Sequence, residues 1–243
     1  LTQMTALNAE QLSAFALLFS ANPEIRTIEL GQFKSAVLDS LCFETAEGIK
    51  VLWREAVMQV PELWLKNRHQ TVYPHKQVLD AAGYHPARPK PLLGELYRRY
   101  IPDLNAVLTL EGLDVDKHLT FFNKWQNSQR VANFWEQTGS LEEHRKYLEE
   151  SVKNNKNQLL IVCLDNQPFA YIEVYWTKED RIAPYYAAGD YDRGIHMLVG
   201  EESHRGAHKV AAWLPSVCHF IYLSDPRTEK IVSEPRADND KMI

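Results

Sequence analysis

The hydrophobic pattern is clearest in the second half of the chain. Residues 195–199 are apolar except for His196, and this run predicts a short buried strand that ends at Gly200. A polar loop follows, and apolar residues then recur at helical spacing up to residue 222, with Pro215 as an expected kink. The predicted order at this point is therefore strand, glycine-bearing loop and helix.

The same two periodicities predict the other elements of this half. Strands are expected in four places, at residues 106–110, 159–163, 169–176 and 229–233. A helix is expected from residues 114–116 onward, and Ser140 with Glu143 has the spacing of a capping box for a second helix. Residues 165–166 predict a hairpin turn, and a last helix should begin at residues 238–239. The resulting order is β-α-α-β-β-β-α-β-α.

The first half of the chain has a weaker pattern. Apolar positions between residues 12 and 19 fit one helix, with an alternating strand after it. Three prolines fall within residues 85–91, where proline removes donors from both helices and sheets. We therefore predict a small α/β accessory domain at residues 1–84, a proline-rich linker at 85–93 and a larger domain at 94–243. No candidate chemistry is visible in the accessory domain.

The amino-acid composition argues against several classes of protein. The 243 residues are 45% hydrophobic and 24% charged, as in an ordinary globular protein. The net charge of -5 argues against a nucleic-acid surface, and neither a membrane-spanning apolar run nor a secretion signal is visible. Cys42, Cys163 and Cys218 are scattered, without the C-x-x-C of a zinc site, and fit core residues in a reducing cytosol. We therefore expect a cytoplasmic protein.

Six sequence blocks together carry a resemblance to a known family. They are GELYRRY at residues 94–100, FWEQTGSL at 134–141, PFAYIEVYW at 168–176, EDRI at 179–182, DRGIHMLVGEESHRGAH at 192–208 and EPRADN at 234–239. They resemble the GNAT superfamily of N-acetyltransferases, in the branch that makes hydroxamate siderophores, and most of all its aerobactin-type N6-hydroxylysine acetyltransferases. The resemblance implies an α/β (α+β) fold in which helices flank a mixed central sheet. It also implies further C-terminal strands that this sequence does not contain.

His196 and Glu234 are the candidate catalytic residues. Taken alone, a single histidine in an apolar strand is typical of a buried side chain whose ring nitrogens form hydrogen bonds with a neighbouring residue. The resemblance implies instead that His196 faces the acceptor amine beside the thioester, where an imidazole with a pKa of about 6.5 can accept a proton. The family position that matches Glu234 is acidic. Glu234 is then either the group that orients His196 or the proton acceptor itself, and an ordinary strand-end glutamate is the alternative.

A second group of residues is expected to bind acetyl-CoA. The N–H groups at the start of a helix attract phosphate, and Gly206 and Ala207 leave room for it. The loop from Arg205 to His208 resembles a shortened pyrophosphate loop of the superfamily, although a plain turn explains the same pattern. His204 lies four residues before His208 without a His-Glu-x-x-His motif, so we expect no metal site. The resemblance implies that the pantetheine arm follows the strand end, and the complete predicted set is Met197, Leu198, Val199, Arg205, Gly206, Ala207, His208 and Asn239.

The acceptor pocket is predicted from two places. Tyr171, Glu173 and Tyr175 alternate on one face of a strand, which gives either a polar pocket wall with aromatic sides or an ordinary solvated face. Trp135 and Glu136 fall between two helices, where this fold builds its acceptor pocket. Glu136 could bind an ammonium group there, and a core tryptophan beside a surface glutamate is the alternative.

Together the candidates predict direct transfer of an acetyl group from acetyl-CoA to the hydroxylamine nitrogen of N6-hydroxylysine. No acyl-enzyme is expected, because no cysteine lies in the matched blocks. The rival interpretations use succinyl-CoA, or N-hydroxycadaverine or N-hydroxyputrescine as acceptor. A lysine-type acceptor needs a positively charged partner for its α-carboxylate. We consider Arg181 and Arg193 for this role and include Arg193 in the predicted site. The alternative from a different class is a non-catalytic acyl-CoA-binding module of a siderophore synthetase. For an enzyme, we expect the downstream siderophore synthetase as a protein partner.

Overall fold

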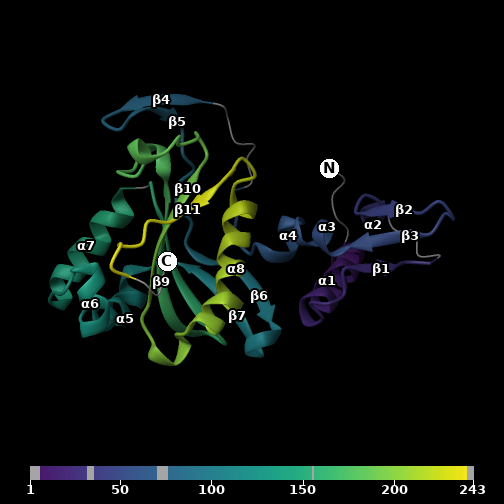
Figure 1. The fold of residues 1–243 in the computed structure, drawn as a ribbon, viewed down its shortest axis with the longest axis horizontal. Helices are drawn as coiled ribbons and strands as arrows, with labels where there is room; N and C mark the ends of the chain where they lie inside the picture. The colour runs from purple at the N-terminus through teal and green to yellow at the C-terminus, as the bar shows by residue number, and fades with distance from the viewer. Residues whose placement is uncertain (1–5, 32–35, 70–75, 155, 240–243) are drawn as a thin grey trace.

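The computed structural model describes residues 6–31, 36–69, 76–154 and 156–239. Within these residues, six strands of the second half form one sheet, with three helices on one face and one long helix on the other (Figure 1). The first half forms a smaller unit beside one edge strand of that sheet, β6 (Gly94–Ile101). The predicted architecture, a mixed sheet flanked by helices, is confirmed.

The strands of the central sheet lie in the order β11-β10-β9-β8-β7-β6. Their bounds are Gly94–Ile101 (β6), Ala106–Gly112 (β7), Gln158–Leu164 (β8), Gln167–Trp176 (β9), Arg193–Val199 (β10) and Ile231–Val232 (β11). Neighbours from β6 to β10 pair antiparallel, whereas β10 and β11 pair parallel, and the described pairing joins only Arg193 with Ile231 and Gly194 with Val232. Beyond these pairs, residues 195–197 line a pocket.

The two faces of the sheet bury different side chains. The covering helices are α5 (Val115–Gln126), α6 (Gln129–Trp135), α7 (Leu141–Lys153) and α8 (Ala207–Ser224). Successive strand residues point to opposite faces. Leu160 therefore packs in a cluster with Trp213 of α8, while Ile161 packs with Phe122 of α5 and Leu148 of α7. The site described below lies on the face that α5, α6 and α7 cover.

Most predicted elements of this half are present. Ser140 and Glu143 form the predicted capping box at the start of α7, and residues 165–166 form the hairpin turn between β8 and β9. The strand expected at residues 229–233 is only the two-residue β11. The pattern failed to predict β6 and α6. The helix expected from residues 238–239 would continue into residues 240–243, which lie outside the described part of the chain.

The first half covers the edge of β6. Its elements are α1 (Ala6–Ala21), β1 (Thr27–Glu29), α2 (Ala36–Asp39), β2 (Cys42–Glu44), β3 (Lys50–Trp53), α3 (Arg54–Met58) and α4 (Pro61–Trp64), with antiparallel strands in the order β1-β3-β2. The Lys66 N–H donates to the Leu96 carbonyl at 2.9 Å, and Leu65 forms an isolated bridge with Tyr97. Buried residues of both halves belong to one hydrophobic cluster. The domain division at residue 84 stays a prediction, because the described packing is continuous across it.

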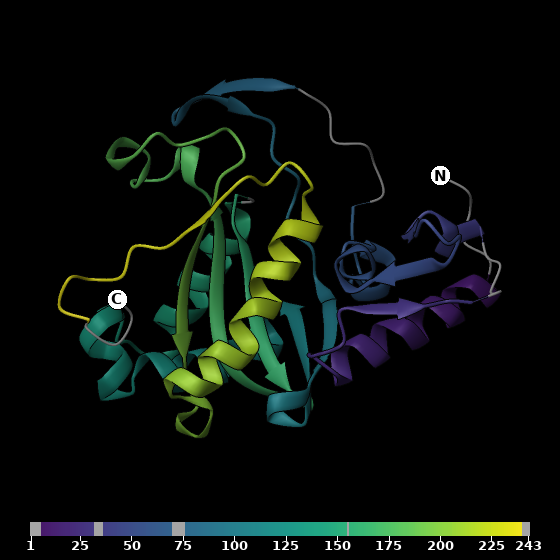
Figure 2. The same cartoon turned by 45° about the vertical axis from the view of Figure 1, so that its right-hand side comes forward.

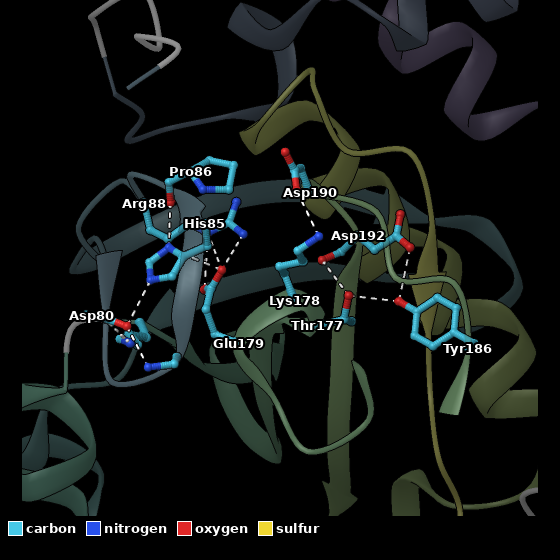
Figure 3. Close-up of polar contacts among 12 residues, drawn as sticks. Asp80, His85, Pro86, Arg88, Thr177, Lys178, Glu179, Tyr186, Asp190 and Asp192 are labelled. Atoms are coloured by element: carbon cyan, nitrogen blue, oxygen red, sulfur yellow. Dashed lines mark hydrogen bonds and ion pairs between the residues drawn. The ribbon is translucent and has the colours of Figure 1, made fainter. Parts of the chain in front are cut away.

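The proline-rich stretch begins in a β-hairpin, β4 (Gln77–Asp80) and β5 (Gly83–Pro86). Figure 3 shows the polar contacts that fasten the hairpin and the chain after it to the loop between β9 and β10. Arg88 Nη2 donates to Glu179 Oε1 at 2.5 Å, and both side chains are buried. The His85 ring lies 3.4 Å from the same carboxylate. The hairpin therefore braces the loop that carries Arg181 to the site.

Candidate active site

His196 lies between two carboxylates. It stands on β10 directly opposite Glu173 of β9. Its Nδ1 atom is 3.3 Å from Glu173 Oε2, and its Nε2 atom is 3.0 Å from Glu234 Oε1. Glu234 comes two residues after β11, so the short parallel pairing with β10 brings it beside His196. The structure therefore joins the two predicted catalytic residues and adds Glu173 as a second partner of the imidazole.

Glu173 is a buried carboxylate with a full set of partners. It is 9% exposed, and its Oε1 atom accepts hydrogen bonds from the Tyr171 hydroxyl at 2.8 Å and the Tyr147 hydroxyl at 3.1 Å. Burial opposes its charge, but hydrogen bonds from His196 and from the two tyrosines outweigh burial and lower the pKa of Glu173. Glu173 therefore stays an anion that holds the imidazole in one orientation.

The pKa of His196 is raised above its ordinary value. Burial opposes the imidazolium, but hydrogen bonds to Glu173 and Glu234 outweigh it. For Glu234, burial likewise opposes the charge, but hydrogen bonds from His196 and Arg181 lower its pKa. Because buried Glu173 holds Nδ1, the Nε2 atom and Glu234 form the more exposed side of this group.

Tyr175 supports the imidazole from the side. The two ring centroids are 4.6 Å apart with an interplanar angle of 35°. Tyr175 pairs across the strands with Gly194, where an added Cβ would lie 2.0 Å from the tyrosine ring. Gly194 therefore makes room for the ring that packs against His196.

A pocket of about 570 Å³ opens beside His196. Its walls come mainly from the end of α6, from β10 and from the segment after β11, and they consist of Phe134, Trp135, Glu136, Gln137, Tyr147, Glu173, Arg181, Ile195, His196, Met197, Ser233, Glu234, Pro235, Arg236 and Asn239. The predicted residues among them are Trp135, Glu136, Glu173, His196, Met197, Glu234 and Asn239. The fold thus brings five of the six matched sequence blocks to one pocket.

Two arginines at this pocket pair with its carboxylates. Arg181 Nη2 donates to Glu234 Oε1 at 3.0 Å, and Arg236 Nη1 donates to Glu136 Oε1 at 2.7 Å. Figure 2 shows the segment after β11 running from the sheet toward α6, which brings Arg236 to Glu136. Each of these two carboxylates is therefore paired with an arginine.

The structure corrects three of the predicted acceptor contacts. Arg193 is 5% exposed and stacks over the Trp176 ring at 3.9 Å, away from the pocket. Residues 193 and 196 differ by an odd number, so a strand directs them to opposite faces. Tyr171 and Tyr175 are buried behind the pocket wall, because α5, α6 and α7 cover the face that the pattern left open. They support Glu173 and His196 instead of lining the pocket.

The predicted CoA-binding segment surrounds the start of α8. Gly206 precedes the helix with φ of 108°, a conformation that glycine adopts without steric cost. The N–H groups of Ala207 and His208 belong to the first turn, where the helix provides no internal acceptor. The described pairing of β10 with β11 ends at Gly194, so within the described residues no strand pairs with the later part of β10, Leu198 included, on that side. The geometry fits a phosphate-bearing ligand that approaches along β10.

Arg130 is a residue of this region that sequence reasoning missed. Its Nη2 atom donates to the carbonyls of Val199 at 2.7 Å and Gly200 at 3.2 Å. Burial lowers the pKa of Arg130, and the nearby charge of Arg205 lowers it further, so two cations gather at this turn. Arg130 lies on α6, a helix that the pattern did not predict, so no signal pointed to it. Arg236 was also missed, although it lies in a matched block two residues after Glu234.

No metal site is found in the described part of the chain, where no three His, Cys, Asp or Glu residues gather in a way that could hold an ion. His204 packs on the Phe169 ring at 4.9 Å and lies in the turn before α8, so it does not share a helix face with His208. Within the same described ranges, no helix is both long and apolar enough to cross a membrane.

The chain matches known proteins over most of its length. The family model described as an acetyltransferase (GNAT) domain matches residues 114–243. A provisionally named lysine N-acyltransferase of Schizosaccharomyces pombe is 37% identical over 238 residues, which are 95% of this chain and 70% of that protein. An N6-hydroxylysine O-acetyltransferase of Escherichia coli is 41% identical, over 79% of this chain and 61% of the relative.

A fungal relative and a solved structure extend these matches. An N5-hydroxyornithine cis-anhydromevalonyl coenzyme A transacylase of Beauveria bassiana is 44% identical, over 64% of this chain and 35% of the relative. The chain thus spans less than two thirds of the bacterial and the Beauveria proteins. A structure of an uncharacterised Bacillus halodurans protein superposes with a TM-score of 0.58 at 27% identity, covering 62% of this chain and 76% of that one.

Proposed function

Since the chain belongs to the GNAT acetyltransferase family, we propose that it acetylates the hydroxylamine nitrogen of N6-hydroxylysine with acetyl-CoA, which yields a hydroxamate for siderophore assembly. The observation that carries this proposal is the His196 imidazole, held between Glu173 and Glu234 at the wall of the pocket. The names of the Escherichia coli and Beauveria bassiana relatives support an N-hydroxylated amino acid as acceptor.

In this proposal the turn before α8 receives the pyrophosphate of acetyl-CoA. Ala207 and His208 present backbone N–H groups at the positive end of the helix, and Arg205 and Arg130 add positive charge. The backbone of residues 195–199 pairs with the pantetheine arm where the pairing with β11 has ended. Asn239 approaches the same arm from the C-terminal segment.

The proposed reaction is a direct transfer between the two substrates. The hydroxylamine nitrogen is less basic than an alkyl amine, so it is largely neutral near pH 7 and its lone pair attacks the thioester carbon. A C–N bond forms, the C–S bond then breaks, and the sulfur leaves as the thiolate of CoA, which takes up a proton from water. In the neutral imidazole, whose proton is on Nδ1 toward Glu173, the Nε2 atom accepts the nitrogen proton. Glu234 stabilises the imidazolium that forms, and Glu173 keeps the ring aligned. A backbone N–H of β10 stabilises the oxyanion.

The cysteine positions support transfer without an acyl-enzyme. Cys163 is 1% exposed, and burial raises its pKa to about 12, which suppresses the thiolate. Among the described residues, no cysteine lines the pocket. Trapping an acylated cysteine during turnover would contradict this part of the proposal.

The test measures CoA release and hydroxamate formation with three acceptors: N6-hydroxylysine, lysine and N-hydroxycadaverine. The N-acyl product forms a coloured ferric complex, whereas an O-acyl hydroxylamine does not, and the name of the Escherichia coli relative makes this distinction necessary. We expect CoA release and ferric colour together with N6-hydroxylysine, and neither with lysine. CoA release without ferric colour would indicate that the hydroxyl oxygen is acylated instead of the nitrogen.

The remaining outcomes choose among the alternatives. Turnover with N-hydroxycadaverine but not N6-hydroxylysine would change the acceptor, and turnover only with succinyl-CoA would change the donor. CoA binding without any turnover would favour a non-catalytic module. We also propose that the hydroxamate passes to a siderophore synthetase, which co-purification with such a protein would test.

A further inference from the structure

We propose, on the basis of the function proposed above, that Arg236 and Glu136 form a subsite for the α-carboxylate and α-ammonium groups of an amino-acid acceptor. Both residues line the outer end of the pocket, and His196, Glu173 and Glu234 line its inner end. The side chains of Glu136 and Arg236 are 73% and 46% exposed, compared with 27% for His196 and 11% for Glu173. An acceptor that reaches His196 with its side-chain nitrogen leaves its polar head near solvent, where these two residues lie.

The Arg236 guanidinium is held with one edge toward the pocket. Its Nε and Nη2 atoms donate to the two oxygens of Asp238 at 3.0 and 2.9 Å. A turn closed by the Asn239 N–H and the Arg236 carbonyl keeps these residues together. The Nη1 atom points instead to Glu136, at 2.7 Å. Asp238 therefore orients the guanidinium, and Nη1 is the donor that can exchange Glu136 for a substrate carboxylate.

Glu136 is held at the pocket by an uncommon backbone conformation. It follows α6 with φ of 54°, the left-handed region that glycine or asparagine usually occupies at a helix end. This conformation fixes the direction in which the Glu136 side chain leaves the end of α6. Its pairing with Arg236 is exposed to solvent, and such pairs contribute little to stability. The pair can therefore open to admit an ammonium group at Glu136 and a carboxylate at Arg236.

Both ends of the pocket include residues of one short segment, because only Pro235 separates Glu234 from Arg236. Both residues line the same pocket, so one acceptor can contact them together.

The other arginine at the pocket, Arg181, is 77% exposed and pairs with a carboxylate of the inner end. Arg181 contacts Glu234 Oε1 through both Nε, at 3.2 Å, and Nη2, at 3.0 Å. A carboxylate drawn to Arg181 would compete with the carboxylate that contacts His196. Arg236 has no such conflict, because its exchangeable partner is Glu136. The subsite thus favours N-hydroxylated α-amino acids over N-hydroxylated diamines, which lack the carboxylate.

The experiment compares Arg236→Gln, Glu136→Gln and wild type with N6-hydroxylysine and N-hydroxycadaverine. For Arg236→Gln we expect kcat/KM with N6-hydroxylysine to fall about 10- to 100-fold, mostly through KM, since one charge-assisted contact is lost. With N-hydroxycadaverine the change should stay within about threefold, because that acceptor never used the contact. Arg145→Gln, which removes an exposed arginine on α7 outside the pocket lining, is the matched control and should leave both acceptors unchanged.

Equal losses with both acceptors would overturn the subsite, because Arg236 would then act on the donor or on the pocket as a whole. No loss with N6-hydroxylysine would overturn it as well. If the wild type acylates neither acceptor, the proposed function fails, and calorimetric binding of N6-hydroxylysine to wild type and Arg236→Gln then decides the subsite by itself. Weaker binding to the variant would support it, and equal binding would refute it.

Discussion

Both ends of the pocket contain acidic and basic side chains, but the two ends differ in their exposure to solvent. At the inner end, Glu173 is 9% exposed and shares its two oxygens among His196 and two tyrosines. At the outer end, Arg236 and Glu136 form an exposed pair. Burial makes a contact costly to break, whereas solvent allows a contact to exchange partners. The difference suggests that rigid residues carry the chemistry and exchangeable residues choose the acceptor.

A buried ion pair outside the pocket gives the largest expected effect. Arg88 and Glu179 have side chains 4% and 3% exposed. Replacing Arg88 with alanine leaves the Glu179 carboxylate buried without this cation, which should lower the free energy of unfolding by about 3–5 kcal/mol. Urea unfolding measures the change. Arg145→Ala breaks the exposed pair with Asp116 and should have no measurable effect, so similar losses in the two variants would contradict the role of burial.

Within the inner end, Glu173→Gln should affect the chemistry strongly. The amide cannot hold the charged imidazole as the carboxylate does, and we expect kcat to fall about 100-fold. Glu173 acts through His196, so the pH profile separates positioning from a general structural role. Because Glu173 helps to raise the pKa of His196, its removal should move the acidic limb of the kcat profile to lower pH. A lower kcat with an unmoved limb would contradict this role, and Glu150→Gln on the exposed face of α7 is the matched control.

The packing behind His196 should show a smaller effect. A methyl group at Gly194 would meet the Tyr175 ring at 2.0 Å, so Gly194→Ala must displace the ring or the strand. We expect thermal denaturation to report a loss of about 1–3 kcal/mol, together with reduced kcat. Gly139→Ala is the control, because its nearest contact is the flexible end of Glu143 at 3.2 Å. A fully stable and active Gly194→Ala protein would show that Tyr175 is not needed at this position.

The charge balance at the inner end predicts a modest dependence of stability on pH. The raised pKa of His196 contributes stability that is complete below its ordinary value of 6.5 and is lost as the pH rises through the raised pKa. The lowered pKa values of Glu173 and Glu234 contribute above 4.5 and are lost as the pH falls below it. The melting temperature of wild type should therefore exceed that of His196→Gln most at about pH 5.5, and less at about pH 8.5. A gap that widens with increasing pH would contradict this balance.

The outer end should give the smallest effect on stability. Arg236→Gln removes an exposed arginine whose partners, Glu136 and Asp238, remain solvated. We expect no change in melting temperature, even though the KM for N6-hydroxylysine rises. A clear loss of stability would show that Arg236 supports the fold of the C-terminal segment, and it would weaken the contrast between the two ends.

Part of this site was predictable from the sequence because it lies within single strands and helix ends. His196 and Glu234 come from the matched blocks, and the alternation of β9 correctly placed Glu173 on one face with its tyrosines. The same rule excludes Arg193 from the face of His196, so that mistake was avoidable.

Other features depend on packing that no local pattern contains. Burial of Tyr171 and Tyr175 requires α5, α6 and α7 to cover that face of the sheet, and α6 was not predicted. The contact between Arg236 and Glu136 joins residues 100 positions apart. The contact between Arg88 and Glu179 likewise requires the hairpin to pack against a loop that is distant in sequence. The prolines predicted a linker at residues 85–93, so this contact was not expected.

The central claim is that His196 accepts the proton during acyl transfer to a hydroxylamine nitrogen. The most direct test is the rate of ferric-positive hydroxamate formation from acetyl-CoA and N6-hydroxylysine by wild type and His196→Ala, with His69→Gln, outside the pocket lining, as the matched control. We expect kcat to fall about 100- to 10,000-fold in His196→Ala, while CoA still binds and the control stays fully active. A His196→Ala enzyme within a few-fold of the wild-type kcat would contradict the account.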